Sequence, residues 1–210
     1  MPRYYPMMMD LNGRDCVVVG GGEVAARKVE SLLSCGAAVT VIAPKLAHEI
    51  AVLAKGGAVT HVAAEYSRRS LAGRALVIAA TDSERVNRAV YDDAVREGVP
   101  VNVVDVPELC TFIVPSVVER GDLLIAISTS GKSPAMAKRI RKEMEERFGP
   151  EYGEMLELMG EVRRLVRERE PDLDKRMRIL TAVANSDLLE RIRGGERPSA
   201  EAVLAGAESK

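Results

Sequence analysis

The sequence is poor in the residues that form disulfides, metal sites and aromatic stacking surfaces. Its 210 residues include no tryptophan, two phenylalanines, two histidines and three cysteines. Cys16, Cys35 and Cys110 are odd in number and lack C-x-x-C spacing, so the sequence predicts neither a disulfide framework nor a zinc site. Cys16 and Cys35 are expected to be small buried residues. His48 and His61 have no partner at ligand spacing, so both are interpreted as structural and no preformed metal site is expected.

Charge of one sign and long apolar runs are also lacking. The net charge is −1, which gives the surface as a whole no attraction for nucleic acid or anionic membranes. No stretch approaches the roughly 18 apolar residues needed to span a bilayer. We therefore expect a cytoplasmic protein with neither nucleic acid nor membrane as a partner. Hydrophobic residues make up 47% of the chain, which is enough for a sizeable core.

The most informative stretch is Val17–Lys28, VVVGGGEVAARK, in which an apolar run leads into three glycines and a helix-forming sequence. It predicts a strand, a phosphate-binding turn and a helix, with the pattern G-x-G-x-x-A. The glycines allow a tight turn and close approach of a pyrophosphate, and the helix N-terminus offers free N–H groups. Such turns are common, but a βαβ unit that continues through Val39–Pro44 strengthens the prediction of a dinucleotide site. The residues expected to contact the cofactor here are Gly20, Gly21, Gly22, Glu23, Val24 and Ala25.

Strands and helices alternate up to about residue 104. Short runs that are apolar on both faces indicate strands of a parallel sheet covered by helices. The strands are expected at Val39–Ala43, Ala58–Val62, Ala75–Ala80 and Val101–Val104, and the helices near Lys45–Lys55 and at Glu84–Glu97. The pattern predicts an α/β fold, a Rossmann-type doubly wound parallel sheet that binds a dinucleotide, over residues 1–114.

Ligands of such sheets bind at the carboxyl ends of the strands, beside the point where the strand order reverses. One crevice therefore collects the residues that follow each predicted strand. Besides the glycine turn, these include Pro44, Thr81, Asp82, Asn102 and Val103, which we predict as further cofactor-binding residues.

Beyond residue 105 the pattern changes. Thr111–Pro115 and Leu123–Thr129 are apolar runs too close together for a helical crossover, which predicts an antiparallel β-hairpin. Ser133–Pro134 is typical of a helix start, and this helix is expected to run to about Phe148. From Glu151 onward the sequence is helical. Its apolar stripes are too few to bury one another, so they are expected to pack on the first domain or on a second subunit.

Four motifs carry a resemblance to a known family. They are GGGEVAARK (Gly20–Lys28), AATD (Ala79–Asp82), NVVDVPELCTFIVPS (Asn102–Ser116) and ISTSGKSP (Ile127–Pro134). Their order and spacing resemble those of siroheme synthase N-terminal modules, the precorrin-2 dehydrogenase and sirohydrochlorin ferrochelatase proteins. The similarity spans about residues 4–150, and the last two motifs are much more specific than the glycine turn.

The resemblance implies oxidation of precorrin-2 to sirohydrochlorin by NAD⁺, as in siroheme biosynthesis. In some family members insertion of Fe²⁺ follows, and the sequence leaves open whether iron, cobalt or no metal is inserted here. The resemblance also implies a homodimer joined through a dimerisation segment at residues 115–150, with a C-terminal helical domain at 151–210. No methyltransferase module is expected, so we expect the stand-alone form.

Asp105 is the expected catalytic residue. It matches the aspartate of the family motif and follows the last predicted strand. Dehydrogenation and metal insertion both remove protons from the macrocycle, and a carboxylate is able to accept them. From the sequence alone, the alternative is an ordinary turn residue before Pro107. Asp82 is the other carboxylate that a strand end brings toward the crevice.

ISTSGKSP is not a Walker A loop, because Ala126 stands where that motif has its first glycine. We predict that its hydroxyl, backbone and ammonium donors bind the carboxylates of the tetrapyrrole, since a helix N-terminus favours anions. An ordinary hairpin-to-helix turn is the alternative. The residues of this predicted substrate site are Ser128, Thr129, Ser130, Gly131 and Lys132. The basic run Lys138–Lys142 is interpreted as a solvated helix face.

One departure from the general dinucleotide pattern concerns the adenosine ribose. Ala43–Pro44–Lys45 replaces the acidic residue that usually ends the second strand. Lys45 is able to attract a 2′-phosphate, so the sequence does not exclude NADP. The resemblance favours NAD as the cofactor, with backbone contacts from Pro44 and Lys45.

Two other classes of function stay open. A nucleotide-sensing regulatory domain without redox turnover would leave Asn102–Ser116 without a purpose and would usually keep the acidic ribose ligand. A chelatase or tetrapyrrole carrier without redox function would be expected to have a degraded glycine turn. That turn is intact at Gly20–Gly22.

Overall fold

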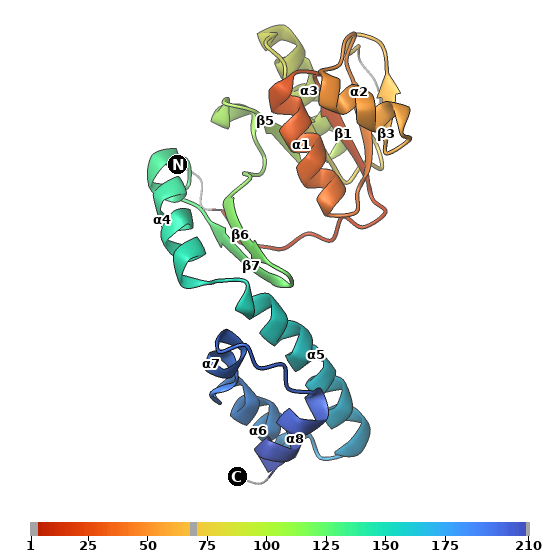
Figure 1. Ribbon diagram of the computed structural model, residues 1–210. Coiled ribbons are helices and arrows are strands. Elements are labelled where there is room, and N and C mark those ends of the chain that lie inside the picture. The colour runs from red at the N-terminus through yellow and green to blue at the C-terminus, as the bar shows by residue number, and fades with distance from the viewer. Residues whose placement is uncertain (1–3, 68–70, 209–210) are drawn as a thin grey trace. The chain divides into compact units, whose positions relative to one another are not determined.

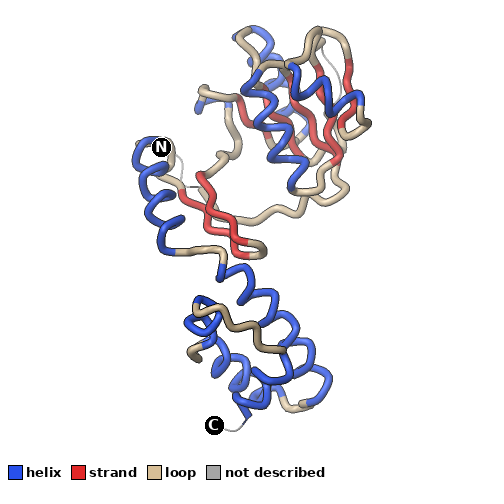
Figure 2. Tube along the Cα trace, viewed as in Figure 1, coloured by secondary structure: helices blue, strands red, loops and turns tan. Residues whose placement is uncertain are grey.

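The computed structural model describes residues 4–67 and 71–208 and divides the chain into two compact units. The N-terminal unit covers Met1–Val114 and the C-terminal unit covers Pro115–Lys210. Figure 1 labels the helices and strands of each unit, and Figure 2 separates helix, strand and loop by colour. Among the described residues, no helix is long and apolar enough to cross a membrane.

A five-stranded parallel sheet forms the centre of the N-terminal unit. Its strands are β1 (Asp15–Val19), β2 (Ala38–Ile42), β3 (Val59–Val62), β4 (Leu76–Ala79) and β5 (Val101–Val103), in the order β3-β2-β1-β4-β5. From β1 the chain first builds to one side, through β2 and β3, and then to the other, through β4 and β5. The predicted Rossmann-type doubly wound sheet is therefore confirmed, and its switch point lies between β1 and β4.

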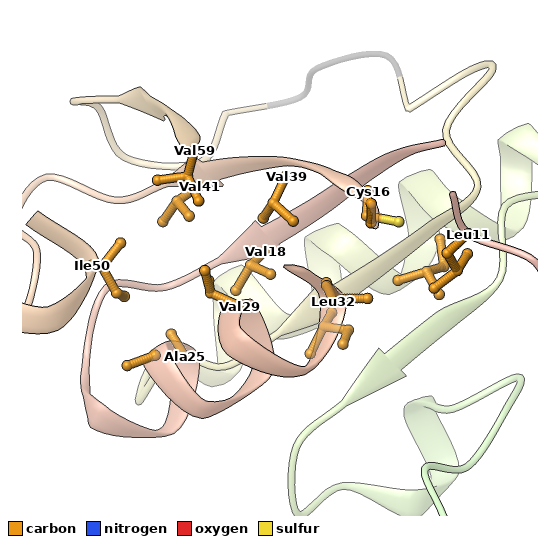
Figure 3. Close-up of a cluster of buried hydrophobic side chains, with 14 of the residues drawn as sticks. Leu11, Cys16, Val18, Ala25, Val29, Leu32, Val39, Val41, Ile50 and Val59 are labelled. Carbon is orange, nitrogen blue, oxygen red and sulfur yellow. The ribbon is translucent and has the colours of Figure 1, made fainter. Parts of the chain in front are cut away.

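Helices cover both faces of this sheet. They are α1 (Glu23–Ser34), α2 (His48–Lys55) and α3 (Glu84–Glu97). Ala25 and Val29 of α1 are fully buried in a cluster with Val18 of β1, as Figure 3 shows. Val90 of α3 is buried in a second cluster with Val17 of β1. Because successive residues of a strand point to opposite faces, α1 and α3 lie on opposite sides of the sheet.

The helix expected near Lys45–Lys55 is present but starts later, whereas the expectation that Cys35 is buried was wrong. Helix α2 starts at His48 rather than near Lys45, because the Ala47 N–H donates to the Gly21 carbonyl at 2.6 Å and holds this stretch along the glycine turn. Cys16 is fully buried as expected, but Cys35 is exposed because it is the residue that ends α1.

The strand predicted at Thr111–Pro115 is also wrong. The Thr111 hydroxyl accepts the Val101 N–H at 2.8 Å, and the Thr111 N–H donates to the Val101 carbonyl at 2.8 Å, so this segment is tied to β5. The hairpin starts later, with β6 (Ser116–Arg120) antiparallel to β7 (Leu123–Ile127). Gly121, with φ +56°, supplies the left-handed conformation that its two-residue loop requires.

Five further helices lie in the described part of the C-terminal unit. They are α4 (Pro134–Arg147), α5 (Glu151–Arg169), α6 (Leu173–Ala184), α7 (Leu188–Arg193) and α8 (Ala200–Glu208). The predicted start of α4 is confirmed, since the Ser133 hydroxyl accepts the Met136 N–H at 3.2 Å. The side chain of Arg120 connects the hairpin to this helix, because its Nε donates to the Phe148 carbonyl at 2.9 Å.

Helices α5 to α8 share a hydrophobic core. Val162 of α5, Val183 of α6 and Leu188 of α7 are almost completely buried within it. The expectation that these helices are too few to bury one another was therefore wrong. Leu173 and Met177 of α6 nevertheless stay 67% and 59% exposed, so the described residues of this unit leave one apolar face uncovered.

Candidate cofactor and substrate sites

The three glycines after β1 have different surroundings. At Gly20, where φ is +122°, an added Cβ would lie 2.1 Å from the Ala80 carbonyl oxygen. At Gly21 it would lie 2.0 Å from the Lys45 carbonyl oxygen. At Gly22 it would meet no atom within 4 Å. The first two glycines are required by the chain's own packing, whereas the third leaves open space beside the helix start.

This open space adjoins the N-terminus of α1. Gly22 is the N-cap residue and has no side chain with which to accept a backbone N–H. Glu23 and Val24 are exposed, whereas Ala25 is fully buried against the sheet, as predicted for the small residue of the pattern. Uncapped N–H groups and the helix dipole favour an anion here, and the absence of a side chain at Gly22 lets one approach closely.

The loops after β2 and β4 flank the glycine turn. Pro44 and Lys45 are exposed, and the Lys45 carbonyl touches Gly21 as described above. Thr81 is half-buried, and its γ-methyl would lie 3.4 Å from a Cβ on Gly20. Asp82 points to solvent beside it. The structure thus brings together the residues predicted at the ends of β1, β2 and β4.

Asp105 lies in a turn immediately after β5. The Val106 N–H donates to the Val103 carbonyl at 3.2 Å, which closes the turn around Asp105. The carboxylate is exposed, and the φ of Asp105 is +61°, in the left-handed region that favours glycine. Such a conformation costs about 1–3 kcal/mol in a non-glycine residue and is typical of functional positions.

Several side chains hold this turn in place. The Cys110 thiol lies 3.3 Å from the carbonyl oxygens of both Val103 and Val106, and burial raises the pKa of the thiol, which keeps it a proton donor. The Asn102 amide donates to the Phe112 carbonyl at 3.0 Å. Asn102 and the buried Val103 were predicted as cofactor contacts, and the structure shows them supporting the turn that carries Asp105.

Lys28 is a member of this region that the sequence analysis missed. It is half-buried on α1. Burial lowers the pKa of Lys28, the adjacent Arg27 lowers it further, and the negative charge of Asp105 raises it. Lys28 is the last residue of the motif GGGEVAARK, but its position in the sequence gave no indication that it lies near Asp105.

The segment predicted to bind substrate belongs to the C-terminal unit, between β7 and α4. Ser130 has φ +53° and is followed by Gly131 with φ +80°, so the backbone turns sharply here. The Thr129 hydroxyl donates to the Ser133 carbonyl at 3.0 Å and accepts the Ser133 N–H at 3.2 Å, and the Ser128 hydroxyl accepts the Ser130 N–H at 3.0 Å. Lys132 is exposed and forms no ion pair with a described residue.

The described residues contain no ready-made metal centre. Within residues 4–67 and 71–208, no three histidine, cysteine, aspartate or glutamate side chains gather as ligands. His61 instead lies 2.9 Å from the Ala43 carbonyl, beside the end of β2.

Comparison with family models divides the chain into three matched regions. Residues 7–116 match the model described as "Putative NAD(P)-binding", 120–147 match "Sirohaem biosynthesis protein central", and 151–207 match "Sirohaem synthase dimerisation region". The match to the dimerisation region therefore lies after residues 115–150, the segment that the sequence analysis assigned to dimerisation.

Comparison with individual proteins also finds siroheme synthases and a precorrin-2 dehydrogenase. The siroheme synthase of Methylobacillus flagellatus is 46% identical over 164 residues, which cover 78% of this chain and 35% of that protein. The siroheme synthase of Chromobacterium violaceum is 38% identical over 201 residues, covering 96% of this chain and 43% of that protein. The chain thus spans less than half of the length of these relatives. The solved structure of SirC, precorrin-2 dehydrogenase, is 26% identical with a TM-score of 0.80, covering 99% of this chain and all of that one.

The fold and the glycine turn define an NAD(P)-binding Rossmann domain joined to a hairpin and a helical region. The chain belongs to the siroheme synthase N-terminal module family.

Proposed function

We propose that this chain is an NAD-dependent precorrin-2 dehydrogenase that forms sirohydrochlorin in siroheme biosynthesis. The observation that carries the proposal is the strained, exposed Asp105 at the carboxyl end of β5, in the same unit as a glycine turn with open space at Gly22. The likeness to SirC and to the siroheme synthases supports the same reaction.

The N-terminal unit fits a nicotinamide dinucleotide. The open space at Gly22 and the uncapped start of α1 suit the pyrophosphate, and Pro44 and Lys45 lie where an adenosine ribose would pass the end of β2. The acidic side chain that usually binds the ribose is absent after β2, where Ala43, Pro44 and Lys45 stand. We propose NAD rather than NADP because of the family resemblance. When bound, NAD⁺ supplies an acceptor for the hydride that leaves precorrin-2.

Asp105 acts on the proton in this proposal. Oxidation of precorrin-2 to sirohydrochlorin removes one hydride, which NAD⁺ accepts, and one proton, which needs a base. The Asp105 carboxylate accepts no hydrogen bond and forms no ion pair with a described residue, so it is free to take that proton. The turn that the Val106–Val103 hydrogen bond closes and that Cys110 supports fixes the backbone of Asp105.

The substrate carboxylates need cationic or N–H donors. We propose that the turn Ser128–Lys132 binds propionate or acetate groups of the tetrapyrrole, with the exposed Lys132 as the charged donor. The Thr129 hydroxyl is engaged with Ser133 and shapes the turn. We also propose a homodimer, which the match to the dimerisation region supports.

Anaerobic incubation of the full chain with precorrin-2 and NAD⁺ tests the proposal. We expect NADH to appear together with the absorption spectrum of sirohydrochlorin. Binding of NAD⁺ without turnover would favour a nucleotide-sensing regulatory domain instead. Adding Fe²⁺ after oxidation is complete then tests whether iron is inserted as a second substrate, an activity that stays a prediction.

A further inference from the structure

Asn87 is a buried polar residue that the proposed mechanism does not use. It lies in the first turns of α3 and is 6% exposed. Both polar ends of its amide bind Thr81, the residue after β4 that was predicted to contact the cofactor. The Asn87 Nδ2 donates to the Thr81 carbonyl at 3.0 Å, and the Asn87 Oδ1 accepts the Thr81 hydroxyl at 2.8 Å.

These two hydrogen bonds fix the conformation of the turn between β4 and α3. The Thr81 hydroxyl also accepts the Ser83 N–H at 3.2 Å, so it is occupied on both sides. Its rotamer is therefore set from within the protein. With the hydroxyl held by Asn87, the γ-methyl of Thr81 faces Gly20, where an added Cβ would lie 3.4 Å away.

Gly20 packs closely against this turn. Its φ of +122° suits a residue without a Cβ, and an added Cβ would lie only 2.1 Å from the Ala80 carbonyl oxygen. The turn that Asn87 holds therefore lies directly against the first glycine of the cofactor loop.

We propose that Asn87 is a positioning residue for dinucleotide binding, which fixes the Ala80–Thr81 turn against Gly20 and so presets the glycine turn for the cofactor. The inference rests on the proposed cofactor site and adds to it a residue that touches neither cofactor nor substrate. It also assigns the Thr81 hydroxyl to hydrogen bonds within the protein, so that this hydroxyl is not a ligand of the cofactor.

Removal of the amide should loosen this contact. In Asn87→Ala, the Thr81 carbonyl loses its amide donor and the Thr81 hydroxyl keeps only its contact with Ser83, so the Ala80–Thr81 turn is held less firmly against Gly20. In Asn87→Asp, which keeps the size of the side chain, a carboxylate oxygen replaces the amide nitrogen that donates to the Thr81 carbonyl. That change sets two oxygens against each other and adds a negative charge near an anionic ligand.

A matched control lies at the other end of the same helix. The Tyr66 hydroxyl donates to the Asp93 carboxylate at 2.9 Å, and the Asp93 side chain is 3% exposed. Tyr66→Phe therefore also deletes a partly buried hydrogen bond to α3. This bond involves neither Thr81 nor the turn that contacts Gly20. Its loss should lower the Tm without changing cofactor affinity.

The test is titration of each full-length variant with NAD⁺ and NADH, beside measurement of Tm and of KM and kcat for NAD⁺ with precorrin-2. We expect the Kd and KM for NAD⁺ to rise about tenfold in Asn87→Ala and at least as much in Asn87→Asp, with kcat within about twofold of wild type. Tyr66→Phe should keep the wild-type Kd.

Wild-type affinity in either folded Asn87 variant, or an equal loss of affinity in Tyr66→Phe, would overturn the proposal. The titration does not depend on turnover. If the wild-type protein binds NAD⁺ but does not oxidise precorrin-2, the proposed function fails while the role of Asn87 is still decided by the Kd values.

Discussion

Lys28 of α1 and Asp105 after β5 attract each other without forming a direct ion pair. Their charges interact, since Asp105 raises the pKa that burial of Lys28 and its neighbour Arg27 lower. Within the described residues, however, the Lys28 ammonium has no carboxylate at ion-pair distance. A half-buried cation whose pKa is lowered by burial and raised by the charge of a carboxylate is a feature that functional sites often show.

Lys28→Met should therefore raise stability and lower activity. The folded-state pKa of Lys28 is depressed, so its charged form opposes folding at neutral pH and this cost fades as the pH rises toward the unfolded value. The Tm of the variant should exceed that of wild type at neutral pH, and the gain should shrink in alkaline buffer. Turnover of precorrin-2 should fall about tenfold, because Asp105 loses its neighbouring cation. Lys55→Met, which removes an exposed cation at the end of α2, is the control and should keep turnover near wild type.

Asp105→Asn separates catalysis from architecture. Asparagine tolerates a positive φ, so the turn and NAD⁺ binding should stay near wild type. Dehydrogenation should fall by a factor on the order of 10²–10⁴, the usual range for a lost acid–base group. Glu108→Gln, which removes an exposed charge from the same loop, is the control. Undiminished turnover in Asp105→Asn would make Asp105 a turn residue and direct the search for a base to Asp82.

Gly22→Asp should block NAD⁺ binding without unfolding the protein. A Cβ at this position would meet no atom within 4 Å, and aspartate is a favourable N-cap, so the Tm should match or exceed that of wild type. The carboxylate would occupy the space proposed for the pyrophosphate and repel it. Calorimetric titration of Gly22→Asp beside the uncharged Gly22→Ala should show the larger loss for aspartate. A folded variant with unchanged affinity would remove the glycine turn from the site.

Lys45→Glu tests which cofactor the chain uses. Lys45 is exposed beside the glycine turn, where a 2′-phosphate would pass. If NADP binds, the substitution should weaken it far more than NAD, because attraction for the extra phosphate becomes repulsion. Lys55→Glu, at the exposed end of α2, makes the same charge change away from the turn. Equal losses for NAD⁺ and NADP⁺ would show that Lys45 does not face the ribose.

The exposed apolar face of α6 is expected to contribute to the dimer. Leu173 and Met177 are one helical turn apart and lie in the region that matches the dimerisation model. Wild type should sediment as a dimer at micromolar concentration, whereas the double variant Leu173→Asp/Met177→Glu should shift toward monomer with little change in Tm. Val52→Glu, which charges an exposed apolar residue of α2, should stay dimeric. A monomeric wild type would contradict the proposed assembly.

Local signals predicted the N-terminal unit well. Helix α3 runs over the predicted residues because Ser83 caps its start and Gly98, with φ +68°, ends it. The hairpin was misplaced because an apolar run at Thr111–Pro115 has the pattern of a strand, and the hydrogen bonds of Thr111 to Val101 depend on tertiary folding. Periodicity and turn chemistry are local, and this contact is not.

Sequence patterns likewise singled out only some residues of the candidate site. The glycine turn and Asp105 stand out in the sequence, whereas the roles of Asn87 and Lys28 depend on side-chain interactions that no sequence pattern marks. Asn87 is an ordinary polar helix residue until the Thr81 carbonyl and hydroxyl are placed against it. Lys28 reads as a surface cation until the turn after β5 brings Asp105 near.

The different surroundings of the three glycines also predict which of them is substituted first when a related domain no longer needs to bind the cofactor. A side chain at the first or second position collides with the chain's own carbonyl groups, so folding alone preserves Gly20 and Gly21. The third position has no neighbour to enforce it. A descendant that kept the fold but lost the cofactor should therefore accumulate substitutions at Gly22 first. The residue at that position is then a more sensitive marker of lost binding in related sequences than the presence of a glycine-rich turn.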